Sequence, residues 1–575
     1  YKLIGPKAPP PRPKTTLKVT QDDRFIRVNT GPALFEISRK RFNLLDKVIL
    51  DANGDGNLAD DETVVHSEPL LGSVVEDPNG RKYYSSAGTH KVRVIEAGPV
   101  MVKVLAQGVH VSDAEGAFKP GLYGYEVSMT FWAGKTFVDV EAILTNNSAK
   151  PIGEPHLEDW SILTRIGAGR GKWGFEAAGK RVRAEAGGGA LLYQDSVGTE
   201  HWRTNTGIKV AGWPKPPAPE LATFRGYKLW QSAGDKRVEL ASGDFADGLA
   251  LCTAGPAGCA VSARNFWQQF PSALGFSADG VIRVSPFPRE YKEVHWIEDG
   301  TAKAQEFRLC FFADGARDGR EQALAAAKRF QKRVFALPSP AHCGQAGALS
   351  DLGPYMVHAK TAQAAKTLLA GQDGAAGAVA RRKYGNGYGW QVFGMTWTER
   401  AGVSGTNYEP LGSSHNLWSH LLSGRDDFLK WGMRVSRHFR DVRAYHVEAR
   451  DNLALWTDWN SYTRSCVIEH YSRLVRGPTS RSKRKVWDIY NHPYQRHRWP
   501  LPNMQHLNVD EVYDLYCLTG DDRALRCMRT IADHGVVLST LHPRPRRARR
   551  MTGWCLRTLG RYYELTGDKR YKPYL

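Results

Sequence analysis

The stretch Tyr516-Cys517-Leu518-Thr519-Gly520-Asp521 is echoed by Tyr563-Glu564-Leu565-Thr566-Gly567-Asp568, near the end of this 575-residue chain. The two glycines are 567 − 520 = 47 residues apart. A weaker copy, Leu421-Leu422-Ser423-Gly424-Arg425-Asp426, has its glycine 520 − 424 = 96 residues upstream, close to two periods. A fixed period of this size is typical of stacked helix pairs.

Each copy indicates a helix end. Apolar residues are followed by a glycine that can adopt the left-handed C-cap, and then by an aspartate that can cap the next helix. Repeated helix pairs build either a solenoid or a closed α/α toroid. We therefore expect residues 345–575 to form an α/α toroid, whose inner ends would make a cleft lined with His, Tyr, Trp and Arg.

The chain before this region has the alternation of β-strands. Residues 1–14 are rich in proline and predict an extended tether. Short strands separated by turn residues predict a small β-barrel or sheet domain over 15–90. Longer alternating segments with Gly and Pro turns predict a large antiparallel β-sandwich over 91–337. Residues 319–335 are helical in character, and a proline-containing linker follows them.

Composition narrows the class of protein. The hydrophobic content of 42% and the 17 tryptophans suffice for sizeable cores. No run approaches the ~18 apolar residues of a membrane helix, so we expect no membrane partner. The net charge of +20 favours a polyanionic partner, which could be nucleic acid, an acidic polysaccharide or anionic lipid; the alternative is that the charge serves solubility alone. The eight cysteines form no CxxC pair and no zinc spacing, and they leave the cellular compartment open.

The two ends of the chain also carry expectations. It begins at Tyr1 instead of a methionine, so we expect the natural N-terminus to be missing. A secreted or periplasmic protein whose signal peptide has been removed would fit this. Leu575 follows a fresh cap with no closing helix, so we expect the repeat array to continue beyond it. The oligomeric state is left open.

Residues 51–62 match the twelve-residue calcium loop of oxygen ligands. Gly56 would make the sharp turn. The ligands would be Asp51, Asn53, Asp55, Asn57 and Glu62. A strand precedes this loop where the usual motif has a helix. The alternative is a long Asn/Gly turn whose acidic residues face water. We expect a structural Ca²⁺ site and no organic cofactor.

Two segments could supply the chemistry of the cleft. Residues 488–499 form a loop rich in His, Arg and aromatic residues, which leads to His506 at the start of a helix. In residues 383–397, aromatic residues alternate with glycines, which suits either a platform for sugar rings or a buried turn. The segment continues through Arg400 and Tyr408 to His415 and Asn416 at the next helix start.

Absent motifs exclude several enzyme classes. The chain has no GxSxG elbow, HExxH pair, Walker loop or dinucleotide fingerprint. No pair of carboxylates stands out in the helical region as a glycosidase would need, although Glu399, Glu409 and Asp458 are candidates.

Taken together, the chain resembles polysaccharide lyases of the exo-rhamnogalacturonan lyase type. The resemblance covers nearly all residues after 15 and rests on the order of domains and of several phrases. These are Asn265–Pro271, His295–Lys303, Tyr388-Gly389-Trp390 with Phe393-Gly394, Ser414–Leu417, and Gln505-His506 running into Tyr516–Asp521. Met395 and Thr396 depart from the pattern, since an acidic residue is expected there.

The resemblance implies an N-terminal RIFT-type β-barrel, a central β-sandwich and a C-terminal α/α toroid. It also implies β-elimination at a uronic acid. That reaction needs cations or amides to neutralise the carboxylate, a base for the C5 proton and an acid for the O4 leaving group.

We assign these roles from loop position. His506 is the predicted base or charge neutraliser, and Tyr408 is the predicted acid. His415 and His446 are the alternates. The predicted substrate-binding residues are Asn416, Arg496, Arg400, Tyr388, Trp390, His497 and Arg498.

Two alternatives stay open. A glycoside hydrolase could use the same toroid, and a non-catalytic glycan-binding protein would need no active site. A nucleic-acid partner is disfavoured because the basic runs lack a recognised module.

Overall fold

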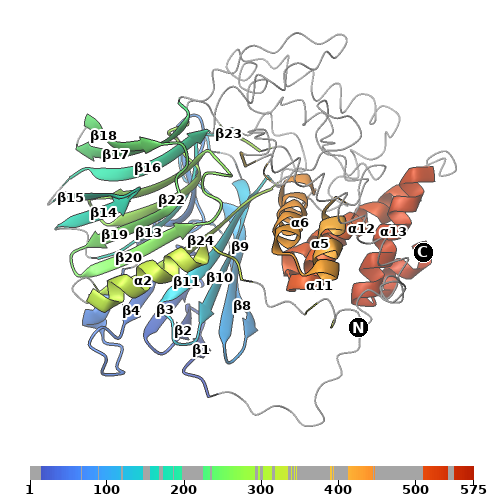
Figure 1. The fold of residues 1–575 in the computed structure, drawn as a ribbon, viewed down its shortest axis with the longest axis horizontal. Helices are drawn as coiled ribbons and strands as arrows, with labels where there is room; N and C mark the ends of the chain where they lie inside the picture. Colours follow the sequence, from blue (N-terminus) through green and yellow to red (C-terminus); the bar gives the residue numbers. More distant parts are fainter. Residues whose placement is uncertain are drawn as a thin grey trace, which may run out of the picture.

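The computed structural model of the chain describes a β-rich first part and a helical last part (Figure 1). The described residues are 14–66, 68–88, 90–117, 119, 121–146, 156–167, 172–184, 187–196, 224–233, 236–291, 295–297, 302–313, 317–334, 339, 342, 345, 389–390, 393, 412–444, 446, 509–541 and 549–575. The predicted tether lies almost wholly outside them.

The first strands form an open five-stranded antiparallel sheet in chain order. Its strands are β1 (Lys18–Gln21), β2 (Phe25–Asn29), β3 (Ala33–Ser38), β4 (Lys47–Leu50) and β5 (Thr63–Val65), with the short helix η1 (Asp60–Glu62) before β5. The described residues contain no closed barrel, so the barrel predicted for 15–90 is corrected. The reason is strand pairing. The next three strands along the chain, β6, β7 and β8, do not close this sheet but belong to the two larger sheets described below.

A nine-stranded sheet forms one layer of the sandwich, in the order β15-β14-β19-β20-β24-β11-β10-β9-β8. The bounds in chain order are β8 (His90–Ala97), β9 (Met101–His110), β10 (Leu122–Trp132), β11 (Phe137–Thr145), β14 (Trp173–Ala177), β15 (Lys180–Ala184), β19 (Leu249–Ala254), β20 (Ala257–Ala263) and β24 (Ala302–Ala313).

An eight-stranded sheet forms the other layer, in the order β18-β17-β16-β21-β22-β13-β6-β7. Its strands are β6 (Gly72–Glu76), β7 (Lys82–Tyr84), β13 (Asp159–Arg165), β16 (Gly189–Ser196), β17 (Gly226–Ala233), β18 (Lys236–Gly243), β21 (Ser272–Ser277) and β22 (Val281–Phe287). The strands β12 (His156–Leu157) and β23 (His295–Trp296) pair separately.

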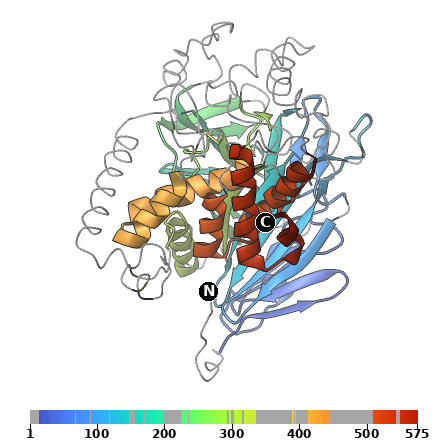
Figure 2. The same ribbon diagram turned by 90° about the vertical axis from the view of Figure 1, so that its right-hand side faces the viewer.

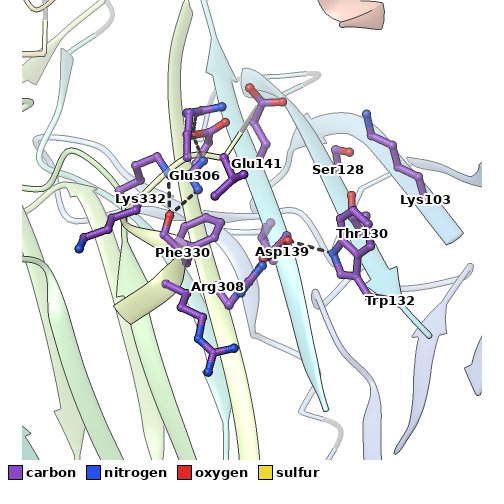
Figure 3. Close-up of a pocket in the computed structure, with 15 residues that line it drawn as sticks. Lys103, Ser128, Thr130, Trp132, Asp139, Glu141, Glu306, Arg308, Phe330 and Lys332 are labelled. Atoms are coloured by element: carbon purple, nitrogen blue, oxygen red, sulfur yellow. Dashed lines mark hydrogen bonds and ion pairs between the residues drawn. The ribbon is translucent and has the colours of Figure 1, made fainter. Parts of the chain in front are cut away.

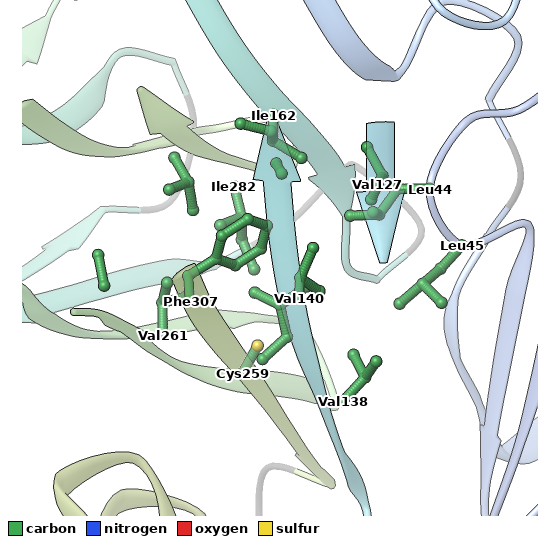
Figure 4. Packing of buried hydrophobic residues seen from close by; sticks show 14 of the residues in the cluster. Leu44, Leu45, Val127, Val138, Val140, Ile162, Cys259, Val261, Ile282 and Phe307 are labelled. Carbon is green, nitrogen blue, oxygen red and sulfur yellow. The ribbon is translucent and has the colours of Figure 1, made fainter. Parts of the chain in front are cut away.

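Alternating side chains of both sheets meet in one continuous core. Val138 and Val140 of β11 point inward beside Phe307 of β24, and Ile162 and Ile282 approach from the other sheet (Figure 4). A period of two places every second residue of a strand on the same face, so this pattern is what the sequence predicts. The antiparallel sandwich is confirmed.

Helix α2 (Arg317–Phe330) covers part of the nine-stranded sheet. Its Ala323 and Ala327 are buried against Cys310 and Phe312 of β24. This confirms the helix that was expected at 319–335.

The last part of the chain is helical. Its elements are α5 (Gly412–Ser423), α6 (Asp426–His438), the π-helical turn η5 (Phe439–Arg443), α11 (Asp510–Thr519), α12 (Asp522–Leu541), α13 (Arg549–Thr566) and η11 (Lys569–Tyr574). The described helices share a core that includes Leu417, Met433, Leu515 and Leu559. The closure of a ring depends on residues outside the described ones, so the toroid stays a prediction.

The repeated phrase does end helices. Gly424, Gly520 and Gly567 have φ of 72°, 66° and 65°, the left-handed conformation that glycine adopts without a steric penalty. In each case the glycine N–H donates to the carbonyl four residues earlier, at 2.6, 2.7 and 2.8 Å. Asp521 then caps α12, because its Oδ1 accepts from the backbone N–H of Arg523 and Ala524.

Two further expectations concern the described residues alone. No described helix is long and apolar enough to cross a bilayer. The six described cysteines are free thiols, including Cys252 and Cys259, which face each other across the β19–β20 hairpin.

Candidate functional site

The helical part lies beside the polar face of the nine-stranded sheet (Figure 2). A cavity of about 800 Å³ opens between them. The sheet side comes from the start of β24, the loop after β20 and the segment after α2. The helical side comes from α6 and η5.

Basic side chains predominate around this cavity. The lining contains eight Lys or Arg residues and four Asp or Glu residues. Lys430, Arg434 and Arg437 are spaced four and three residues apart, so they share one face of α6. The aromatic residues Trp431 and Phe393 also line the cavity, and the Arg434 guanidinium lies 3.9 Å from the Phe393 ring centre. Cations beside aromatic rings suit an anionic sugar.

Lys303 of β24 is the unusual group in the lining. It shares the inward face of β24 with Phe307 and Leu309, which explains why its side chain is only 1% exposed. The ammonium donates to Gln269 Oε1 at 2.6 Å, and among the described residues no carboxylate forms an ion pair with it. Burial lowers the pKa of Lys303 to about 7, although the negative charge of Asp441 opposes the shift. The side chain can therefore exchange a proton near neutral pH.

The loop after β20, which holds Gln269 against Lys303, contains a residue with a left-handed backbone conformation. Asn265 follows β20 with φ of +55°, a left-handed conformation that asparagine tolerates better than most residues. The carbonyl of Asn265 accepts from Gln269 N–H at 2.9 Å, which holds the Gln269 side chain at the cavity. Backbone strain of this kind is concentrated at functional sites.

Two phrases of the sequence meet at this loop. Gly389 N–H donates to the carbonyl of Gln268 at 2.7 Å, and Trp390 N–H donates to that of Phe270 at 3.1 Å. The segment 389–390 therefore docks on the loop that holds Gln269. The Trp390 ring is buried edge-on against Phe287, with centroids 4.9 Å apart.

The four carboxylates of the lining are all paired. Glu141 and Glu306 stand directly opposite each other on β11 and β24, an arrangement that destabilises a sheet without cations. Arg440 binds Glu141 at 2.7 Å and Arg437 binds Glu306 at 2.6 Å. Asp441 pairs with Arg440 at 2.8 Å, and Asp427 pairs with Arg425. Each of the four is thus engaged in an ion pair, and burial raises the pKa of Glu141 although the charge of Arg440 opposes the shift.

Most predicted site residues lie outside the described residues. These are His506, Tyr408, Arg400, Arg496, His497, Arg498 and Tyr388. His415 belongs to α5, where only its backbone is described. Asn416, in the same helix, is half-buried and is not among the described residues that line the cavity. The structure therefore does not test these roles.

Besides Asn416, two of the predicted catalytic and substrate-binding residues are described with their side chains, Trp390 and His446. Trp390 lines the cavity and is 4% exposed, and its ring packs against Phe287, so it contributes to packing at the edge of the cavity. His446 lies next to η5, where its Nε2 is 3.1 Å from the Asp441 carbonyl oxygen. Burial, together with the nearby Arg523, lowers the pKa of His446 to about 3. An imidazole with this pKa is a weak proton acceptor at neutral pH.

Sequence reasoning named Lys303 as part of a family phrase but gave it no role. One signal could have found it: a lysine on the apolar face of a strand, followed at two-residue intervals by Gln305, Phe307 and Leu309.

The predicted calcium loop is described in full. Its side chains accept from its own backbone: Glu62 Oε1 from Ala52 and Asn53, and Asp51 Oδ2 from Gly56 at 3.1 Å. Asp51 Oδ1 is buried without a hydrogen-bond partner, which fits a missing ligand bond. The described residues nevertheless contain no group of three or more His, Cys, Asp or Glu side chains that could hold a metal ion. Calcium binding stays a prediction.

Thermal melting tests whether residues 51–62 bind Ca²⁺. If the loop binds Ca²⁺, a calcium concentration one hundred times the Kd should stabilise the fold by about 2.7 kcal/mol, and a chelator should reverse the effect. Asp55→Asn should remove most of the response, because it deletes one negative charge from the ligand set. A melting temperature of the unaltered chain that is indifferent to calcium would refute the site.

No protein-family model and no curated protein matches this chain. Several solved structures do. A galactose mutarotase-like protein from Lactobacillus casei is 11% identical, with 51% of this chain and 99% of that chain covered and a TM-score of 0.25. An alpha-mannosidase from Enterococcus faecalis is 10% identical (55% and 31% covered, TM-score 0.27). A glycosyl hydrolase family 38 protein from the same organism is 9% identical (52% and 32% covered, TM-score 0.30). Scores this low support no argument about activity.

Proposed function

We propose that this chain is a polysaccharide lyase that cleaves a uronic-acid-containing acidic polysaccharide, of rhamnogalacturonan type, by β-elimination. The supporting observation is the cavity between the sandwich and α6, which combines a surplus of cations with a buried lysine whose pKa is about 7. A lyase needs both features at one place.

Lys303 is the proposed base. With its pKa lowered to about 7, Lys303 is partly an uncharged amine at neutral pH, and the amine lone pair can take the C5 proton of the uronate. The electrons of the C5–H bond then form the C4–C5 double bond, and the C4–O4 bond breaks. The leaving oxygen takes a proton from an acid, for which Tyr408 is the prediction.

Cations of the α6 face would prepare the substrate. A uronate carboxylate in the cavity would lie among Lys430, Arg434 and Arg437. Neutralising that carboxylate stabilises the negative charge that develops on C5 when the proton leaves. The positive charge of the whole chain, +20, would draw an anionic polymer to the site.

A glycoside hydrolase is the alternative, and among the described residues its acid and base would have to come from the four lining carboxylates, each of which is held in an ion pair. Product analysis separates the two reactions. Elimination leaves an unsaturated uronate that absorbs in the ultraviolet, whereas hydrolysis does not.

The test is ultraviolet absorbance during incubation with rhamnogalacturonan, ulvan and alginate, each with and without calcium. We expect a steady rise on one of them. Reducing sugar released without absorbance would establish hydrolysis instead. Folded protein that releases neither product would leave glycan binding as the function.

A further inference from the structure

A second hollow of about 440 Å³ lies on the outward face of the nine-stranded sheet. Figure 3 shows Lys103, Ser128 and Thr130 on one side of it, and Phe330 and Lys332 on the other. The hollow shares five lining residues with the cavity. These are Glu141, Arg264, Glu306, Lys332 and Arg333. The two spaces therefore adjoin along the sheet, and we call the second hollow the outer-face groove.

Strand alternation explains the polar lining of the groove. Ser128, Thr130 and Trp132 are every second residue of β10, on the face opposite to the buried Val127 and Met129. The serine and threonine hydroxyls can both donate and accept hydrogen bonds, as sugar hydroxyls require. The Trp132 indole N–H donates to Asp139 at 3.0 Å, which fixes the ring at the edge of the groove.

The charges of the groove leave cations in excess. Asp139 is neutralised by Arg308, with contacts of 2.5 and 2.8 Å. Glu306 is shared by Arg264, Arg333 and Arg437. Lys103 and Lys332, in contrast, form no ion pair with any described residue. An anion in the groove would meet these two ammonium groups, with Glu96 opposite Lys103 as the nearest cross-strand carboxylate.

We propose that the outer-face groove binds sugar units of the same anionic chain that is cleaved in the cavity, at positions remote from the bond that breaks. This inference rests on the proposed function for the identity of the chain. Remote units held in this way contribute binding energy to the reaction at the cavity. The enzyme would therefore prefer long substrates to short ones.

The experiment uses the full chain with short and long size fractions of rhamnogalacturonan oligosaccharides. Binding is measured by calorimetry, and turnover by ultraviolet absorbance. The variant is Lys103→Ser, because Lys103 lines the groove and not the cavity. The control is Lys91→Ser, which makes the same change of charge at an exposed position outside the groove.

We expect the unaltered chain to bind the long fraction more tightly. The groove variant should weaken binding of the long fraction roughly three- to tenfold, and that of the short fraction much less. The control should change neither. An equal loss of affinity for both fractions, or equal affinity of the unaltered chain for both, would refute the proposal that the groove binds remote sugar units.

The failure of the proposed function gives a different pattern. If the long fraction binds through the groove but no absorbance develops, the proposed binding role of the groove is supported and the proposed elimination reaction is refuted. If absorbance develops at the same rate on both fractions and the groove variant matches the control, the elimination reaction is supported and the binding role of the groove is refuted.

Discussion

Replacing Lys303 with methionine should lower kcat for elimination by about 10²- to 10⁴-fold, the range that a positioned general base contributes. Methionine keeps the length of the side chain and its burial on β24, so the fold should persist. The loss is measured by ultraviolet absorbance at saturating substrate, with circular dichroism as the check on folding.

Lys303→Arg is the matched control. It preserves the positive charge, but a guanidinium stays protonated at all accessible pH values and cannot take a proton. Both variants should therefore be inactive if Lys303 is the base. Recovery of activity in Lys303→Arg would show that the charge matters and not the proton transfer. Wild-type kcat in Lys303→Met would refute the role entirely.

The pH profile gives an independent check. The neutral amine is the active form, and burial sets the pKa of Lys303 near 7. The value of kcat/KM should therefore rise tenfold per pH unit below 7 and level off above it. His506→Ala separates the two proposed bases. If His506 were the base, its loss would abolish turnover while Lys303→Met would not.

Replacing Arg440 with methionine should destabilise the chain by about 3–5 kcal/mol, the usual cost of removing one partner from a buried ion pair. Arg440 is buried and binds three carboxylates: Glu141 at 2.7 Å, Asp441 at 2.8 Å and Asp521 at 2.6 Å. The variant would leave all three without their shared cation. Urea titration of the purified chain measures the difference.

The control is Arg425→Met. Arg425 pairs with Asp427 where the two side chains are 42% and 62% exposed, so its loss should cost less than about 1 kcal/mol. Equal costs at the two positions would show that the buried network does not hold the helices on the sheet.

Acid should lower the stability of the chain through the ion pairs of Arg440. Burial raises the pKa of Asp521, but the charges of Arg440 and Arg437 outweigh it and lower the pKa to about 2. A carboxyl whose pKa is lowered on folding stabilises the fold above its unfolded value of 3.8, and this contribution is lost as the pH falls towards 2. The Arg440→Met variant should therefore show a smaller loss of stability between pH 4 and pH 2.

Local patterns predicted the parts of the fold that depend on near neighbours. The helix ends at Gly520 and Gly567 are decided by one left-handed glycine each, and the cap at Asp521 by one carboxylate. The layers of the sandwich follow from alternation along strands such as β11. The predicted barrel failed because strand alternation does not specify which strand pairs with which, and β6 pairs with β13, more than eighty residues later.

The candidate site could be predicted only in part, for the same reason. Cation-rich and aromatic segments of the helical region were recognisable, but the cavity joins residues from distant segments. Lys303 meets Gln269 of the loop after β20, and Asp441 of η5 lies close enough to influence its pKa. No spacing in the sequence connects these three positions.

The amino-acid sequence by itself determined the alternation that buries one face of each strand, the glycine and aspartate caps of the helices, and the positive charge. Each of these depends on a residue type and its immediate neighbours. Only the tertiary structure decided which strands pair, which carboxylates Arg440 and Arg437 neutralise, and that Lys303 lies in a cavity without an ion-pair partner among the described residues. Desolvation and Coulomb energy depend on what surrounds a group in space, and folding brings those surroundings together from distant segments.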